Sequence, residues 1–167
     1  MCPQEDRVPA TAAVRFLRER KIFFQPHFYR YEEHGGTPHA AKSLGVPEHS
    51  VIKTIVMETG QREPLLALMH GDCEVSVKQL ARTIGTDSVT QCSEPKAQKH
   101  TGYTVGGISP FGTRTELPVY AEDTIFKLPL IYINGGKRGF LISINPVDLE
   151  TNLSITIVHV AIPRTTL

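Results

Sequence analysis

The chain has 167 residues, 40% of them hydrophobic, which is enough for one domain with a single core. Lys and Arg total 18 and Asp and Glu total 17, so the formal net charge of +1 creates no global field of either sign. This excludes binding of nucleic acid by bulk charge. A nucleic-acid partner would have to be held by a local basic patch and by pockets.

The first part of the chain predicts two helices separated by a strand. Residues 11–21 have the spacing of a helix with one apolar face, and the aromatic run 22–31 is typical of a strand. A short helix is expected over 37–45, with Thr37 as its N-cap and Gly45 just past its end. The apolar face of the first helix is expected to carry Ala12, Phe16 and Leu17.

The rest of the chain predicts strands interrupted by helices. The apolar runs 51–57 and 64–71 read as buried strands joined by a polar turn. Helices are expected over 74–85, capped by a glycine, and over 93–102, and residues 130–145 as a β-hairpin with glycines at its turn. The fold class is therefore α/β in composition, more specifically α+β, with helices around a mixed or antiparallel sheet in one domain, 1–167. The inward residues of the helix over 74–85 are expected to be Val77, Leu80, Ala81 and Ile84.

Cysteine and histidine spacing predicts no metal site. The cysteines form no CxxC or CxxH pattern, and the seven histidines form no HExxH pattern, so we expect neither a metal nor a cofactor. The N-terminus lacks a basic segment followed by an apolar run, and no stretch is long enough to span a bilayer. We expect a cytoplasmic protein that is neither exported nor anchored, in a reducing compartment. Its three cysteines are Cys2, Cys73 and Cys92.

Lys53 stands out because it lies inside the apolar strand "VIKTIV". Burying an ammonium group is costly unless it contacts an anion or a polar partner. One interpretation is an edge-strand lysine whose head group reaches water. The other is a lysine in a pocket, where it contacts a phosphate, a hydroxyl or a carbonyl. The residues alone leave both open.

The stretch "TGYTVGGISPFGT", residues 101–113, is uncharged and rich in glycine. At Gly106 and Gly107 the missing side chains would let a ligand approach backbone N–H groups directly, although a plain turn between strands would have the same composition. Ser109 lies outside a GxSxG pattern and precedes a proline, which argues against a catalytic triad.

Four segments, in order, carry a resemblance to a known family: "LGVPEHSVIKTIVM", "KAQKHTGY", "GYTVGGISPFGTRTELPVY" and "IYINGGKRGF". Together they make the chain similar, from residue 22 to 149, to the YbaK/EbsC family of bacterial aminoacyl-tRNA deacylases, which is related to the editing domain of many bacterial prolyl-tRNA synthetases. The resemblance implies a compact α/β domain with a central mixed, mostly antiparallel, barrel-like sheet.

The resemblance also implies a function. The expected activity is removal of cysteine misattached to tRNA(Pro), in trans, with Cys-tRNA(Cys) as a further candidate substrate. In the implied chemistry the cysteine thiol attacks its own ester and expels the tRNA. The expected partners are the acceptor end of aminoacyl-tRNA and prolyl-tRNA synthetase. The alternatives are a deacylase for Ala, Ser or Thr, and a non-catalytic module that binds tRNA or a synthetase.

The matching positions supply the expected site. Lys53 would orient the terminal ribose or phosphate, and the N–H groups of Gly106 and Gly107 would stabilise the oxyanion. Substrate contacts are expected from a further six residues, among which Tyr29 would close the pocket: Phe28, Tyr29, Thr54, Ile108, Ser109 and Asn134. Asn134 departs from the serine common in relatives, and the tail 151–167 does not resemble the family's helical end. A basic patch for tRNA would comprise Lys42, Lys96, Lys99, Lys137 and Arg138.

Overall fold

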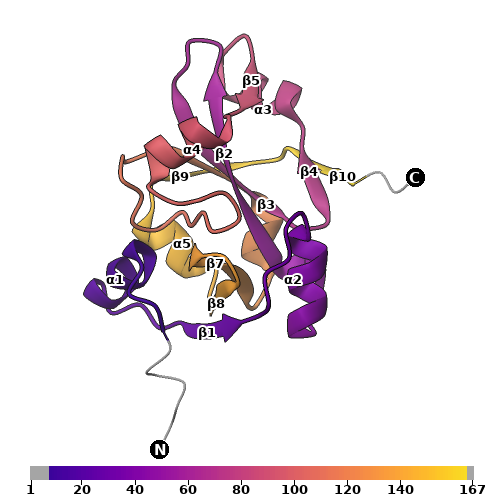
Figure 1. Ribbon diagram of the computed structural model, residues 1–167. Coiled ribbons are helices and arrows are strands. Elements are labelled where there is room, and N and C mark those ends of the chain that lie inside the picture. The colour runs from indigo at the N-terminus through magenta and orange to yellow at the C-terminus, as the bar shows by residue number, and fades with distance from the viewer. Residues whose placement is uncertain (1–7, 165–167) are drawn as a thin grey trace, which may run out of the picture.

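The computed structural model describes residues 8–164, which form a mixed sheet with helices around it (Figure 1). Eight strands make the sheet. Seven follow the order β1-β8-β7-β2-β3-β6-β9, and the eighth, β5, pairs with the end of β2 that β7 does not reach. The strands are β1 (Gln25–Phe28), β2 (Val51–Thr59), β3 (Pro64–His70), β5 (Val89–Gln91), β6 (Val119–Glu122), β7 (Ile131–Lys137), β8 (Phe140–Ile144) and β9 (Ile155–Val158). A separate two-stranded sheet pairs β4 (Cys73–Val75) with β10 (Ala161–Pro163).

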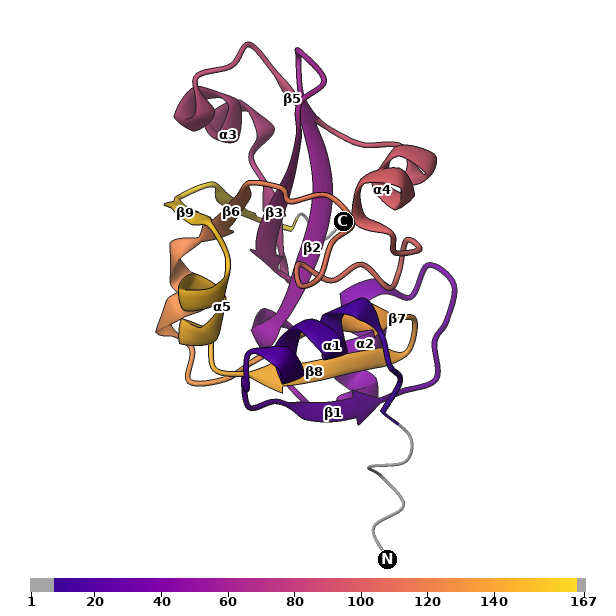
Figure 2. The ribbon, with the colours of Figure 1, turned by 90° about the vertical axis from the view of Figure 1, so that its left-hand side faces the viewer.

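Five α-helices and two 3-10 helices are found among the described residues. Figure 2 shows β2 running the length of the molecule, with α3 and β5 near one of its ends and α1, β1 and β8 near the other. None of these helices is long and apolar enough to cross a membrane. They are α1 (Ala12–Glu19), α2 (Gly36–Leu44), η2 (Glu48–Ser50), α3 (Val77–Ile84), α4 (Glu94–Thr101), η3 (Asp123–Lys127) and α5 (Val147–Asn152).

Strand β2 is paired along its whole length on one side and only at its ends on the other. It is antiparallel to β3 from Ile52 to Glu58. On its other side, β7 pairs only with Val51 and Ile52, and β5 begins to pair at Met57. Across residues 8–164, no strand therefore pairs with residues 53–56 on that side.

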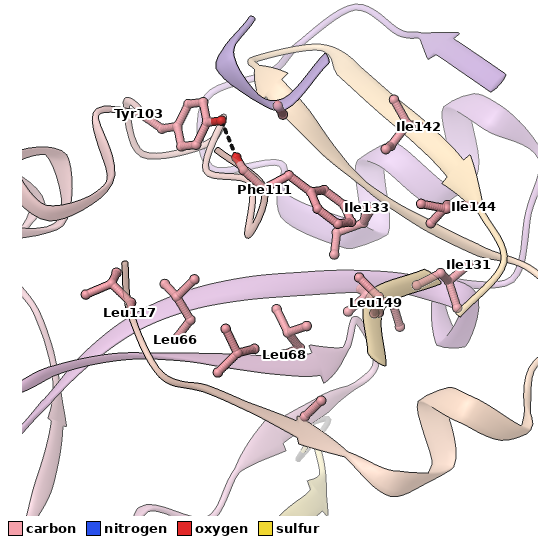
Figure 3. Close-up of a cluster of buried hydrophobic side chains, with 14 of the residues drawn as sticks. Leu66, Leu68, Tyr103, Phe111, Leu117, Ile131, Ile133, Ile142, Ile144 and Leu149 are labelled. Carbon is pink, nitrogen blue, oxygen red and sulfur yellow. Dashed lines mark hydrogen bonds between the residues drawn. The ribbon is translucent and has the colours of Figure 1, made fainter. Parts of the chain in front are cut away.

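The larger core lies between the β7–β8 hairpin, β3 and the loop that follows α4 (Figure 3). Phe111 at its centre is fully buried, and the Tyr103 hydroxyl donates a hydrogen bond to the Phe111 carbonyl. Residues 103–111 are thus held at both ends by buried groups, although they form neither helix nor strand. Around Phe111 lie Leu66, Leu68, Leu117, Ile131, Ile133, Ile142, Ile144 and Leu149.

Several sequence-predicted boundaries are confirmed. Gly45 and Gly85 end α2 and α3 in the left-handed conformation, which a glycine adopts without steric cost. The side chain of Ser93 accepts a hydrogen bond from the Lys96 N–H and so caps α4. The strand expected over 22–31 is shorter, however, and covers only Gln25–Phe28.

Thr37 is not the N-cap of α2. The helix begins at Gly36, and the Thr37 hydroxyl is bonded elsewhere: it lies 2.9 Å from a carboxylate oxygen of Glu48 and 3.1 Å from the Gly71 carbonyl. Arg164 holds the same carboxylate through two hydrogen bonds, of 2.7 and 2.8 Å. This cluster ties the first turn of α2 to η2 and to the C-terminal segment.

The apolar faces of the two predicted helices are partly as expected. Leu17 is buried in α1, with Ala12 and Phe16 partly buried against the core. In α3, Leu80 and Ala81 are buried, but Val77 is 41% exposed because it occupies the first helical position, at the edge of the packed face.

The sheet is mixed but is not closed into a barrel. Its outermost strands, β1 and β9, are edges and do not pair with each other. The pairs β1–β8, β7–β8, β2–β3 and β2–β5 are antiparallel, and β2–β7, β3–β6 and β6–β9 are parallel. The sequence left the structure of the tail open; beyond α5 it forms the strands β9 and β10.

Replacing Phe111 with alanine should destabilise the protein by about 3–5 kcal/mol, because the cavity would open in the centre of the core. Urea denaturation would measure the loss. Phe23, which is 78% exposed, provides the matched control, and Phe23→Ala should change stability by less than about 0.5 kcal/mol. Equal effects of the two substitutions would contradict this assignment of the core.

Candidate active site

A cavity of about 470 Å³ opens where β2 has no partner strand. Its walls come from the first turns of α2, the segment that precedes α2, the loop after α4 and the β7–β8 hairpin. Among the residues that line the cavity are Tyr29, Tyr31, Lys53, Thr54, Gly106, Ile108, Asn134 and Arg138.

The backbone of Thr54 faces this cavity. In a strand, N–H and C=O groups point alternately to its two sides. The Val51 carbonyl accepts a hydrogen bond from the Gly71 N–H next to β3, so the backbone groups of odd-numbered residues in β2 point toward β3. The Val56 carbonyl accepts from the Cys92 N–H, so the backbone groups of even-numbered residues point to the opposite side. Thr54 therefore presents its backbone to the open side. Its hydroxyl is buried and has no hydrogen-bond partner among the described residues. A buried polar group without a partner is rare and suggests a site that a ligand completes.

The side chain of Lys53 leaves β2 on the face opposite to the side chain of its neighbour Thr54. Lys53 is also among the residues that line the cavity. Its ammonium group lies 2.5 Å from the Cys73 carbonyl, to which it donates, and burial lowers the pKa of Lys53. β2 is a central strand of the sheet, but residues 53–56 have no partner strand on one side, so Lys53 lies at a locally open edge and is half-buried. A hydrogen bond to a carbonyl is the kind of contact that the pocket-lysine interpretation predicts, and the role of Lys53 toward a ligand stays a prediction. An ammonium group has three donors, so two remain for a ligand.

The glycine loop is a tight turn held by two side chains of the β7–β8 hairpin. Gly106 has a positive φ of 94°, which a residue with a side chain rarely adopts. Its carbonyl accepts from the Asn134 amide at 3.1 Å, and the Val105 carbonyl accepts from Arg138 at 2.9 Å. Within residues 8–164, no acceptor is found for the N–H groups of Gly106 and Ile108. Both residues line the cavity, so their N–H groups are candidate donors to a ligand.

Gly107 does not have the expected role. Its N–H already donates to the Thr104 carbonyl at 2.8 Å, and the residue is buried and does not line the cavity. A Cβ at this position would lie 2.9 Å from the backbone nitrogen of Arg138. Gly107 is thus needed for close packing of the loop on the hairpin, and Ile108 replaces it as the second candidate donor.

Asn134 uses both ends of its side-chain amide. The oxygen accepts from the N–H groups of Gly136 (2.7 Å) and Lys137 (3.1 Å), within a bulge of the β7–β8 ladder, and the nitrogen donates to Gly106. A single side chain therefore fixes both the hairpin turn and the glycine loop.

Two other expected substrate contacts do not reach the cavity. Phe28 and Tyr29 are adjacent and point in opposite directions: Tyr29 lines the cavity, whereas Phe28 is 44% exposed and stacks on Phe140. Ser109 is fully buried, and its hydroxyl accepts from the Phe111 N–H. Ser109 therefore shapes the loop rather than contacting a ligand.

Sequence reasoning missed Tyr31 and assigned Arg138 only to the basic patch. Tyr31 shares a face with Tyr29 by the two-residue period of extended chain, a signal that could have found it. The Arg138 guanidinium lies over the Tyr31 ring, 5.0 Å from its centre, and both line the cavity. Of the other patch residues, Lys96 forms an ion pair with Glu58 at 3.0 Å.

Fold and site together define an open-sheet α/β domain with a cavity bounded by backbone donors and a half-buried lysine. The family model described as "Aminoacyl-tRNA editing domain" matches residues 33–151. The chain belongs to this family, and its activity at the level of the family is aminoacyl-tRNA editing.

Individual relatives agree with this assignment. The chain is 29% identical over 147 residues to the Enterococcus faecalis protein named "Putative Cys-tRNA(Pro)/Cys-tRNA(Cys) deacylase EbsC", covering 87% of this chain and 88% of that protein. It is 30% identical to a proline–tRNA ligase of Nitratidesulfovibrio vulgaris, over 63% of this chain but only 17% of the ligase. A solved structure of "a putative trans-editing enzyme for prolyl tRNA synthetase" shares the fold, with a TM-score of 0.79 and 19% identity over 95% of this chain and 100% of that one.

Asn134→Asp should separate the two roles of the amide. The carboxylate can still accept from Gly136 and Lys137 but cannot donate to Gly106, so the loop should lose its tether while the hairpin keeps its turn. We expect kcat/KM for deacylation to fall about tenfold or more, since misplaced donors stabilise a transition state poorly. Asn134→Ala, which removes both roles, should also lose roughly 1 kcal/mol of stability by urea denaturation. Wild-type kcat/KM in Asn134→Asp would contradict the tethering role.

Proposed function

We propose that this protein is a trans-editing deacylase that removes cysteine from tRNA(Pro), with the thiol of the substrate as the nucleophile. The observation that carries the proposal is the cavity wall itself, which offers backbone donors and a lysine but no activated nucleophile among the described residues. The name of the E. faecalis relative supports the choice of amino acid.

The candidate nucleophiles at the wall argue for attack by the substrate. Cys92 is a thiol in the lining, but burial raises the pKa of Cys92 and so disfavours the reactive thiolate. The Thr37 hydroxyl is engaged with Glu48 and Gly71. His39, a possible base, has a ring nitrogen 2.7 Å from the Arg30 carbonyl. None of these side chains forms the nucleophile–base pair that covalent catalysis by the protein requires.

The cysteine substrate supplies what the wall lacks. Its sulfur forms a bond to its own ester carbonyl carbon, the bond from that carbon to the ribose oxygen breaks, and the thiol proton passes to the departing ribose hydroxyl. The products are a cyclic cysteine thioester, which water then opens, and free tRNA. The N–H groups of Gly106 and Ile108 would stabilise the oxyanion in between.

Lys53 and four other residues that line the cavity would hold the acceptor end of the tRNA. Two donors of the Lys53 ammonium remain for the terminal ribose or phosphate, while Thr54 offers a hydroxyl to the aminoacyl group. Arg138 and Tyr31 form a cationic and aromatic pair that suits the terminal nucleotide. Tyr29 would close the pocket over the bound amino acid.

A second site of this kind has a physical purpose. Cysteine and proline are similar in volume, and an apolar pocket separates ligands that differ by one methylene by only about 1–3 kcal/mol. A synthetase that selects by size therefore accepts some cysteine. A site that uses the reactivity of the thiol discriminates on a property that proline does not have.

Lys53→Ala should reduce kcat/KM about a hundredfold or more while the protein remains folded, since a buried ammonium group contributes more to binding than to the core. Deacylation kinetics and a thermal melt would measure both effects. Lys78→Ala, at an exposed position of α3, is the matched control. A well-folded Lys53→Ala variant with wild-type turnover would remove Lys53 from the site.

Cys-tRNA(Pro) should be cleaved at least a hundredfold faster than Ser-tRNA(Pro), because serine has nearly the same volume but a far weaker nucleophile. A cyclic cysteine thioester, detected by rapid quench and mass spectrometry, should precede free cysteine. Equal rates with free cysteine as the first product would indicate a water-directed hydrolase. Including Ala-, Thr- and Pro-tRNA(Pro) and Cys-tRNA(Cys) tests the other deacylase specificities, and no turnover on any would indicate a binding module.

A further inference from the structure

The β2–β3 hairpin brings His49 beside two adjacent residues, Asp72 and Cys73, that are more than twenty positions further along the chain. His49 lies in η2, two residues before β2, and Asp72 and Cys73 lie just after β3, with Cys73 the first residue of β4. The Gly71 N–H donates to the Val51 carbonyl, so the two ends of the hairpin lie side by side. One ligand atom from each side chain lies within 4.8 Å of the other two.

The donor atoms lie nearly as far apart as the ligands of one metal ion. His49 Nδ1 lies 2.9 Å from an Asp72 carboxylate oxygen, and Cys73 Sγ lies 3.5 Å from the same oxygen. At the bond lengths of zinc to nitrogen, oxygen and sulfur, tetrahedral ligands are about 3.3–3.6 Å apart. The three atoms could therefore bind one ion with small side-chain movements.

A neighbouring histidine holds His49 in place. The fully buried His70 ring stacks on the His49 ring at 3.7 Å. One nitrogen of His70 lies 2.6 Å from the His49 carbonyl, which can only accept, so the proton is on that nitrogen; the other accepts from Thr124. Both the plane and the backbone of His49 are thus fixed before any ion arrives.

A cation can reach the cluster from solvent, and the charges around the cluster nearly balance. The side chains of His49 and Asp72 are 45% and 41% exposed, so an ion can reach them from solvent. Glu48 and Glu74 contribute negative charge nearby, and Arg164 and Lys53 contribute positive charge. The Glu48 charge is largely taken up by Arg164 through two hydrogen bonds.

We propose that His49, Asp72 and Cys73 bind a divalent transition-metal ion of the zinc type, with water in the fourth position. Imidazole, carboxylate and thiolate together are a donor set that zinc prefers. On binding, the Cys73 thiol loses its proton to solvent and a metal–sulfur bond forms, while the His49 proton resides on Nε2. No electron is transferred.

The site lies behind the cavity rather than in it. The Cys73 carbonyl accepts the hydrogen bond from Lys53, so an ion bound to the Cys73 side chain would fix the partner of the cavity lysine. The ion would join η2 to the start of β4, and its role would be structural. It takes no part in the proposed deacylation, so each proposal can fail without the other.

Cobalt(II) binding to the full-length protein tests the site, because cobalt replaces zinc and reports thiolate ligation by an intense near-ultraviolet band. In a Cys2→Ser background we expect one cobalt per chain with this band, displaced by one equivalent of zinc. Saturating zinc, at about a hundredfold above Kd, should raise the melting temperature by roughly 5–10 °C, and a chelator should reverse the rise.

Matched variants make the result specific. Cys73→Ser should abolish the band and His49→Ala should weaken cobalt binding at least tenfold. Cys92→Ser and His159→Ala should leave both unchanged; His159 forms a similar exposed pair with Asp123, at 3.1 Å. Absence of the band in the parent protein, its persistence in Cys73→Ser, or its equal loss in Cys92→Ser would overturn the proposal and leave His49 and Asp72 as an ordinary ion pair.

Discussion

Incomplete pairing of β2 is the constraint on which the site depends. β7 pairs with β2 only as far as Ile52, and β5 starts at Met57, so part of a central strand has an unpaired side. In most sheets such backbone groups are bonded to a neighbour. Here the loop after α4 and the first turns of α2 surround the gap instead and leave a cavity. The polar groups that a third strand would have satisfied become available to a ligand.

The loop that replaces a strand is irregular but well held. Tyr103 and Phe111 fix it in the core, and Asn134 and Arg138 bind its carbonyls from the hairpin. With the carbonyls occupied, the free N–H groups of Gly106 and Ile108 are set in position before substrate binds. Donors oriented in advance stabilise a developing charge without the cost of reorganisation.

Local patterns in the sequence were sufficient for the elements and for part of the site. Apolar runs located the β2–β3 hairpin, caps located α3 and α4, and the motifs led to Lys53, Thr54 and the glycine loop. Details that depend on tertiary contacts were not accessible. Composition could not reveal that the Gly107 N–H is already bonded within the turn, or that the Ser109 hydroxyl is buried. Cysteine and histidine spacing likewise missed the cluster of His49, Asp72 and Cys73, because a hairpin more than twenty residues long brings them together.

The ion pair between Arg164 and Glu48 has a consequence for synthesis of the protein. Glu48 holds the first turn of α2, yet its own partner is 116 residues further along the chain. The edge strand β1 similarly cannot pair until β8, more than a hundred residues further along the chain, has been made. A ribosome must therefore release nearly the whole chain before either contact can form, and such distant pairings slow folding. A product of interrupted translation that ends before β7 would lack Asn134 and Arg138, and with them the hairpin wall of the cavity.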